Sequence, residues 1–169
     1  MNRFIVADSA KCIGCRTCEV ACVVSHQENQ DCATVTPDAF AARIRVVKTG
    51  TFSTAVTCHH CEDAPCANVC PVQAISRDNG AISVEQSRCI GCKSCMIACP
   101  FGAMQVTAPV QGKMQEKAQA LKCDLCGHRA AGPACVEACP TQALACVDPA
   151  RLRENRIRTL FVPILSADC

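Results

Sequence analysis

The sequence predicts an α+β fold that contains little regular structure. Short segments rich in β-branched residues alternate with short helical segments. Between them lie four cysteine-rich runs, which together take up sixteen of the 19 cysteines. A chain of 169 residues with so little regular structure needs bound groups to supply much of its folding free energy. The cysteines are the obvious place for such groups.

The expected strands are short, and one pair is marked by its turn. Asn79-Gly80 is a strong hairpin signal because both residues tolerate the positive φ of a tight turn. The segments on either side, 74–76 and 81–84, are therefore expected to pair. Other segments of this kind are Arg3 to Ala7, Arg43 to Lys48, Ser53 to Thr57, Met104 to Thr107 and Ala143 to Val147.

Short helices are expected to follow the third cysteine of each run, as in Thr17 to His26. A turn that starts at Pro109 is expected to lead into an exposed helix ending at Leu121. The C-terminal tail, 149–169, carries arginines before an apolar end. This tail is either a partner-docking segment or a solvated segment that packs on its own domain.

The four runs repeat one spacing. Each ends in C-x3-C, and in three of them Pro follows the last Cys directly. The second and fourth runs have a longer gap before their third Cys. The runs are Cys12, Cys15, Cys18 and Cys22; Cys58, Cys61, Cys66 and Cys70; Cys89, Cys92, Cys95 and Cys99; and Cys123, Cys126, Cys135 and Cys139.

This spacing indicates iron-sulfur ligation, because C-x2-C-x2-C-x3-C-P is the run of bacterial ferredoxins. Three closely spaced cysteines on a tight loop direct their sulfurs around a small cluster, and Gly14 and Gly91 let the backbone approach it. The fourth Cys lies beyond that loop and is free to bind a neighbouring cluster. We therefore expect a ferredoxin-like fold with four [4Fe-4S] clusters.

Two other uses of the cysteines remain as alternatives. Sixteen thiolates would also fill four zinc sites, although structural zinc usually takes two separated C-x2-C pairs rather than a compact trio and a distant fourth. Disulfides are disfavoured in a reducing compartment. The first eight residues offer only a short apolar run, and no stretch approaches the roughly 18 apolar residues of a membrane span. We expect a cytoplasmic chain without direct membrane insertion.

Nucleic acid is not expected as a partner. The polypeptide has a formal charge of +2 and contains no Trp, no Tyr and only five Phe. Each oxidised cluster with four thiolates adds about two negative charges, so the loaded protein is acidic. Nucleic-acid binding needs a basic surface and, for single strands, stacking aromatic residues.

The remaining reactive residues do not form a catalytic pattern, so no enzyme activity of the chain itself is expected. His59 and His60 precede Cys61, but the second run already has four cysteines, so both are expected to be exposed or to support the ligands. His26 and His128 are treated in the same way. Three cysteines lie outside the runs. They are Cys32, Cys146, which we expect to be a small buried apolar residue, and the terminal Cys169.

The order of the four runs resembles the four-cluster electron-transfer subunits of molybdopterin oxidoreductases such as formate dehydrogenases and dimethyl sulfoxide reductase. The segments 1–22 and 61–71 resemble more specifically the small electron-transport proteins associated with hydrogen-evolving formate dehydrogenase and formate hydrogenlyase. The resemblance covers residues 1 to about 148. One departure is that Val23, rather than Pro, follows Cys22.

The resemblance implies that the last Cys of each run crosses to another cluster, and that the first run pairs with the fourth and the second with the third. Two bicluster modules result, 1–57 with 100–148 and, inserted between them, 58–99. The implied ligand sets are set 1 (Cys12, Cys15, Cys18, Cys139), set 2 (Cys22, Cys123, Cys126, Cys135), set 3 (Cys58, Cys61, Cys66, Cys99) and set 4 (Cys70, Cys89, Cys92, Cys95).

The resemblance also implies a function, an electron carrier from a molybdopterin formate dehydrogenase catalytic subunit to a hydrogenase or another iron-sulfur subunit. One alternative is an assembly or scaffold protein for that complex. Another is an electron-transfer subunit of a dimethyl sulfoxide-type reductase.

Overall fold

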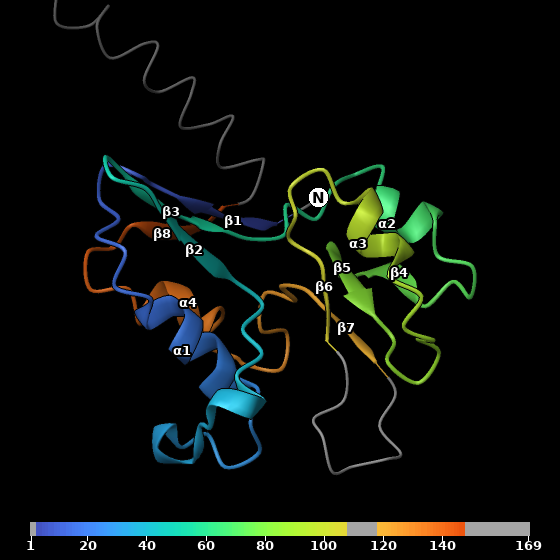
Figure 1. The fold of residues 1–169 in the computed structure, drawn as a ribbon, viewed down its shortest axis with the longest axis horizontal. Helices are drawn as coiled ribbons and strands as arrows, with labels where there is room; N and C mark the ends of the chain where they lie inside the picture. The colour runs from blue at the N-terminus through green and yellow to red at the C-terminus, as the bar shows by residue number, and fades with distance from the viewer. Residues whose placement is uncertain (1–2, 108–117, 148–169) are drawn as a thin grey trace, which may run out of the picture.

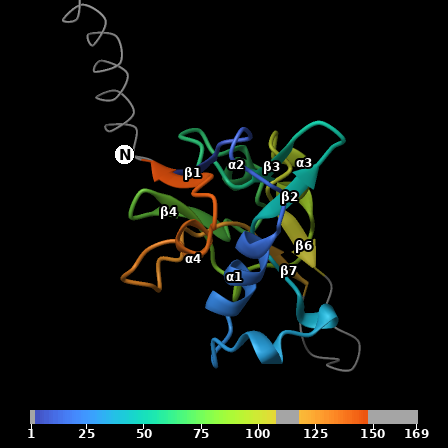
Figure 2. The same cartoon turned by 90° about the vertical axis from the view of Figure 1, so that its left-hand side faces the viewer.

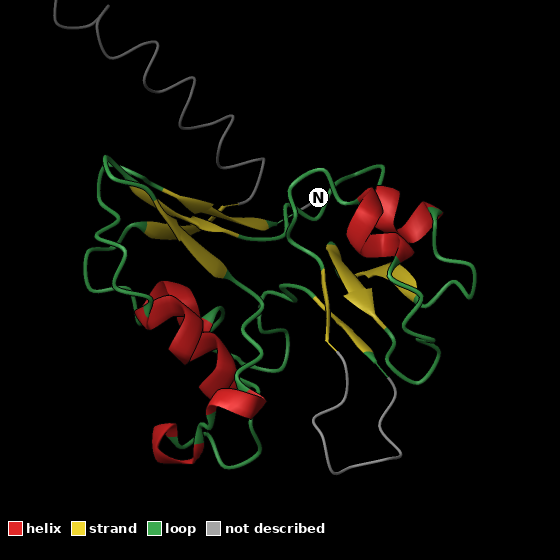
Figure 3. Ribbon diagram, in the orientation of Figure 1, coloured by secondary structure: helices red, strands yellow, loops and turns green. Residues whose placement is uncertain are grey.

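The computed structural model describes residues 3–107 and 118–147. Helices and strands are mixed and short, and the strands form two-stranded antiparallel pairs rather than a closed sheet. Figures 1 and 3 show two halves lying side by side, each with its own helices and strands. The expected α+β class is confirmed. The tail 149–169 lies outside the described residues.

The first half is built from both ends of the described chain. Strand β1 (Phe4–Ala7) pairs with β8 (Leu144–Val147), with Ile5 opposite Cys146, and β2 (Arg45–Lys48) pairs with β3 (Ser53–Val56). Helix α1 (Thr17–Ser25) packs on α4 (Ala134–Glu137), and Figures 1 and 2 both show them as neighbours. Two 3-10 turns that the sequence did not reveal, Cys32–Thr34 and Pro37–Ala39, follow α1.

The second half repeats this plan. Helix α2 (Pro65–Asn68) packs on α3 (Ser94–Ala98), and β4 (Ile75–Asp78) pairs with β5 (Ala81–Val84) around the expected Asn79-Gly80 turn. Both turn residues have positive φ, 48° at Asn79 and 78° at Gly80. A second pair joins β6 (Gln105–Thr107) to β7 (Gln119–Leu121).

The expected helix ending at Leu121 is wrong over its last residues. Gln119 to Leu121 form strand β7, and Ala120 and Leu121 are buried. Ala120 packs in the second core, so pairing with β6 lets this segment bury its apolar side chains where an exposed helix would not. The earlier part of the expected helix, 108–117, lies outside the described residues.

Each half has its own small core. In the first, Ile5, Ile44 and Val46 pack against buried cysteines of the first and fourth runs. In the second, the core residues come from both sides of the expected module boundary at residue 99: they are Ala64, Ala74, Ile75, Ile82, Cys89, Cys95, Met104 and Ala120. Residues after Cys99 thus contribute to the second core as well as those before it.

Candidate functional site

Set 1 lines one pocket of the first half. The pocket has about 320 Å³ of empty space, part of it open to solvent, and its wall includes Val46, Ala55 and Leu144. Its thiols come from the loop before α1, from the first turn of α1 itself and, across the β1–β8 pair, from the segment before β8. The cysteines in this wall are Cys12, Cys15, Cys18 and Cys139.

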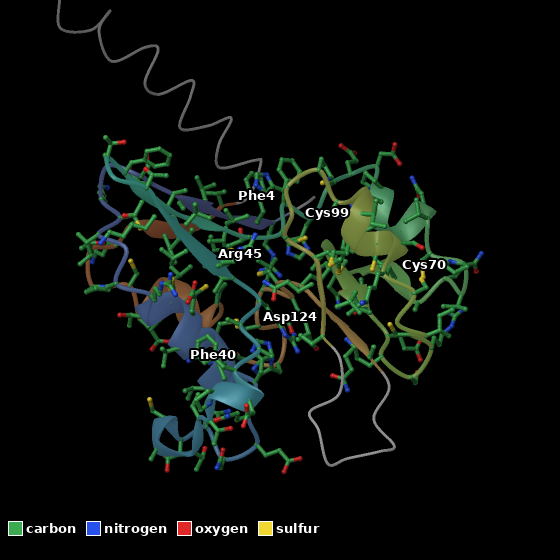
Figure 4. The ribbon with its side chains drawn as sticks, viewed as in Figure 1. Phe4, Phe40, Arg45, Cys70, Cys99 and Asp124 are labelled. Carbon is green, nitrogen blue, oxygen red and sulfur yellow. The ribbon has the colours of Figure 1, made fainter. Side chains whose placement is uncertain are left out.

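Set 4 lines the corresponding pocket of the second half. This pocket has about 340 Å³ of empty space, and Ile75, Val84 and Ala120 of the second core form part of its wall. Figure 4 shows Cys70 beside α2 and α3. The cysteines in the wall are Cys70, Cys89, Cys92 and Cys95.

Within set 2, and likewise within set 3, some thiols raise the pKa of their neighbours. Burial raises the pKa of Cys135 far above that of an ordinary thiol, and Cys123, Cys22 and Cys126 raise it further. Burial also raises the pKa of Cys61 and of Cys66, and in both cases Cys58 and Cys99 add to the rise. Iron ligation requires thiolates, so binding must displace these protons.

The residues after the last Cys of the second and fourth runs adopt the same backbone conformation. Gln73 and Gln142 both have φ 50°, and the next N–H, of Ala74 or Ala143, donates to Cys70 Sγ or Cys139 Sγ at 3.3 Å. The Pro that directly follows each of these cysteines fixes the chain direction at this turn. An N–H donor aimed at sulfur stabilises the thiolate and tunes an attached cluster.

The first and third runs also share a conformation. Gly14 and Gly91 have φ 70° and 69°, and Arg16 and Lys93 have φ 63° and 65°, just before α1 and α3. The hydroxyl of Thr17 donates to Cys15 Sγ at 3.3 Å and lowers the Cys15 pKa; a bond from Ser94 lowers the pKa of Cys92 in the same way. Cys15 and Cys92 are both exposed.

The sulfurs are spaced more widely than one zinc ion requires. Four thiolates at the Zn–S distance of about 2.3 Å would lie about 3.8 Å apart. In the described part of the chain, the one group of three or more potential ligand atoms within 4.8 Å is that of His26, Asp124 and His128, which contains no Cys. The 18 described cysteines are free thiols. The cysteine-lined pockets and the N–H donors aimed at sulfur fit an iron-sulfur cluster.

His26 and His128 belong to a polar network beside set 2. His26 Nε2 lies 3.0 Å from Asp124 Oδ2, and Arg43 donates to the same oxygen. Burial disfavours the charged ring, but Asp124 and the Cys22 carbonyl outweigh it and raise the His26 pKa to about 10. Figure 4 shows Asp124 near the centre of the molecule, where the two halves meet. These groups partner one another and hold α1 against the fourth run.

The two adjacent histidines of the second run differ sharply. His59 is exposed and stacks on Phe101, with ring centroids 3.9 Å apart, and on Phe4, at 5.8 Å. His60 is fully buried, and its backbone N–H donates to Cys58 Sγ at 3.4 Å. Cys32 is exposed. Cys146 is half-buried against the first core, rather than fully buried as expected, because it lies in the outer pair β1–β8.

Sequence reasoning missed two buried charges. Glu19 is 6% exposed, and its carboxylate accepts the Val46 N–H at 2.6 Å, which joins α1 to β2. Lys122 is 4% exposed and donates to the carbonyl oxygens of Ile82 and Cys123. Neither position stands out in the sequence, since Glu19 lies between cysteines of an ordinary run and Lys122 precedes one. In the described ranges no helix is long and apolar enough to cross a bilayer.

Comparison with known proteins places these features in a family. Residues 47–149 match the 4Fe-4S dicluster domain, and residues 9–24 match a 4Fe-4S binding domain. The chain is 66% identical to YsaA of Escherichia coli over 94% of this chain and 98% of that protein. It is 62% identical to the Escherichia coli electron transport protein HydN, over 96% and 99% of the two chains.

A more distant relative is formate hydrogenlyase subunit 2 of Escherichia coli. It is 41% identical over 88% of this chain and 83% of that protein. The ligand pattern, the paired pockets and these matches agree, and the chain belongs to the family of 4Fe-4S dicluster proteins that contains the electron transport protein HydN.

Proposed function

We propose that this chain is an electron carrier that takes electrons from a formate dehydrogenase and passes them through four [4Fe-4S] clusters to a hydrogenase or another iron-sulfur acceptor. The observation that carries the proposal is the gathering of the cysteines in space, set 1 and set 4 each around one pocket. The relatives' names, an electron transport protein and a formate hydrogenlyase subunit, supply the link to formate.

Sets 1 to 4 are the ligands in this proposal. Bound clusters would supply one-electron redox chemistry, and the chain's own residues would orient and tune them. The N–H groups of Ala74 and Ala143 donate to Cys70 and Cys139, and that of Arg43 donates to Cys22 at 3.4 Å. Such donors stabilise the more negative, reduced state.

Electrons would arrive and leave at sets 1 and 4. Each of these sets includes an exposed cysteine, Cys15 or Cys92. All four thiols of set 2 are buried: Cys22, Cys123, Cys126 and Cys135. An exposed ligand brings a cluster close to a partner's surface, while buried ligands suit an internal step. The two sets with exposed thiols lie in different halves, so this arrangement favours a relay across the molecule.

The proposed organisation is two bicluster modules with one inserted in the other. Sets 1 and 2 belong to the outer module and sets 3 and 4 to the inner one. The pairing of β1 with β8, which brings Cys12 to Cys18 near Cys139, supports the outer module. The chain itself carries no substrate chemistry in this proposal. Its partner is the catalytic subunit of a formate dehydrogenase.

The test is anaerobic mixing of the holoprotein with a formate dehydrogenase catalytic subunit and formate. We expect the visible absorbance of the clusters to bleach in step with formate oxidation. Clusters that remain oxidised beside an active enzyme would reject the carrier role and favour a scaffold. Clusters that stay oxidised beside the formate enzyme, but are reoxidised after chemical reduction by a dimethyl sulfoxide-type reductase with its substrate, would change the partner.

A further inference from the structure

Lys122 is a buried cation between the two halves. It follows β7 of the second half and directly precedes Cys123 of set 2, and it is 4% exposed. Its ammonium donates to the carbonyl oxygen of Ile82, in β5, and to that of Cys123, at 2.6 Å. The side chain therefore ties the second core to the fourth cysteine run.

No carboxylate forms an ion pair with Lys122 within residues 3–107 and 118–147; its acceptors there are the two carbonyl groups. Burying an ammonium group without a counter-charge is strongly unfavourable. Negative charge brought close to this group, such as that of a thiolate-bound cluster, would therefore stabilise the fold.

Two thiols lie within electrostatic reach of Lys122. Burial raises the pKa of Cys123 to about 12, and the Leu125 N–H and the Lys122 charge oppose that rise. Burial also raises the pKa of Cys66, where Lys122 again opposes the rise. Cys123 belongs to set 2 and Cys66 to set 3, so the Lys122 charge acts on a thiol of each of these two sets.

His60 contacts the same residue, Ile82, and carries a second buried donor. Its ring is 0% exposed, and Nδ1 accepts the N–H of Ile82 at 2.9 Å. Since Nδ1 accepts, the proton of the neutral ring is on Nε2, and this nitrogen has no hydrogen-bond partner among the described residues. A buried donor without an acceptor is costly. Like Lys122, His60 presents a buried donor that forms no hydrogen bond or ion pair with a carboxylate among residues 3–107 and 118–147.

We propose that Lys122 and His60, oriented by the C=O and N–H of Ile82, form a buried donor pair that faces the clusters of sets 2 and 3 and stabilises their reduced states. This inference rests on the proposed function, because it needs both sets to hold clusters. Positive charge and N–H donors favour an added electron and raise the reduction potential.

The test is a redox titration of the anaerobic holoprotein, followed by electron paramagnetic resonance. Lys122→Met keeps the length of the side chain and removes the charge. We expect the reduced-to-oxidised ratio of at least one cluster to fall about tenfold at a fixed potential, a shift of about 59 mV for one electron. Lys122→Arg keeps the charge and is expected to restore the wild-type ratio.

The matched control is Lys93→Met, which removes an exposed lysine beside Cys92 of set 4. Solvent screens this charge, so the ratio should change less than twofold. Equal shifts in the Lys122→Met and Lys93→Met proteins, or none in either, would overturn the inference.

His60→Phe is the second variant and remains informative if Lys122→Met fails to fold. It removes the Nε2–H donor, and we expect the ratio for the same cluster to fall several-fold, while His59→Phe leaves it unchanged. An unchanged reduced-to-oxidised ratio in the His60→Phe protein would contradict the proposal that His60 acts together with Lys122. Iron and sulfide analysis distinguishes failure of the proposed function from failure of this inference. A wild-type protein without clusters rejects the proposed function. Variants that contain clusters but have unshifted potentials reject this inference alone.

Discussion

Gly91→Ala should destabilise the set 4 loop more than Gly14→Ala destabilises the set 1 loop. The two glycines occupy equivalent places in their runs, with φ 69° and 70°. A Cβ at Gly91 would lie 2.7 Å from the Ala118 Cβ and 3.2 Å from the Ala118 carbonyl oxygen. At Gly14 the nearest atoms are the Ser53 Cβ at 3.2 Å, and the Lys48 Cδ and the Ser53 Oγ at 3.3 Å.

The magnitude follows from these contacts. The left-handed conformation costs an alanine roughly 1–2 kcal/mol at either position. Overpacking adds roughly 1–3 kcal/mol at Gly91, because the 2.7 Å approach to the Ala118 Cβ is closer than the 3.2 Å approach to the Ser53 Cβ at Gly14, and the Ala118 carbonyl oxygen lies beside it. Each 1.4 kcal/mol corresponds to about a tenfold change in rate.

The assay is the rate at which cluster absorbance is lost in guanidinium under anaerobic conditions, which measures kinetic stability. Gly91→Ala should lose its most labile cluster about tenfold faster than Gly14→Ala. Equal rates, or faster loss from Gly14→Ala, would refute the reasoning from the Ala118 contact.

Four further predictions concern the ligands and the buried groups. Cys139→Ser should lose about a quarter of the bound iron, because one of four clusters loses a ligand, whereas Cys32→Ser should lose none; iron analysis distinguishes the two. Glu19→Ala should lower the free energy of unfolding by about 1–3 kcal/mol, because a buried N–H of β2 loses its acceptor, and Glu19→Gln should restore most of it in thermal melts. Arg77→Lys should speed the loss of one cluster, because the Arg77 guanidinium donates to three successive carbonyl groups of the loop 60–62. An unchanged rate of cluster bleaching would contradict a stabilising role of these hydrogen bonds. Removing iron with a chelator should abolish most of the circular dichroism signal of the native fold, and an apoprotein with native-like dichroism would contradict a cluster-dependent fold.

Most of the local structure follows from patterns that the sequence displays directly. The Asn79-Gly80 hairpin appears as expected because its turn chemistry is local, and β8 is found within the expected segment after the last Cys-Pro. Strand β7 was missed because Lys113 to Leu121 has the composition of a helix. Its strand conformation depends on pairing with β6, which a local pattern does not show.

The candidate ligands were also visible, since the spacing of cysteines is a property of the sequence. Their supporting groups were not. Glu19, His60 and Lys122 matter because of what lies opposite them, Val46 in one case and Ile82 in the other two. These partners are 22 to 40 positions away along the chain. Such contacts depend on tertiary packing, so only the structure reveals them.

The most direct test of the central claim is iron and sulfide analysis of the anaerobically purified protein, combined with Mössbauer spectroscopy. Four [4Fe-4S] clusters predict about sixteen iron and about sixteen sulfide per chain, with the Mössbauer spectrum of the oxidised protein typical of [4Fe-4S]²⁺. Zinc in place of iron, or iron for two clusters only after full reconstitution, would contradict the assignment of sixteen cysteines to four clusters.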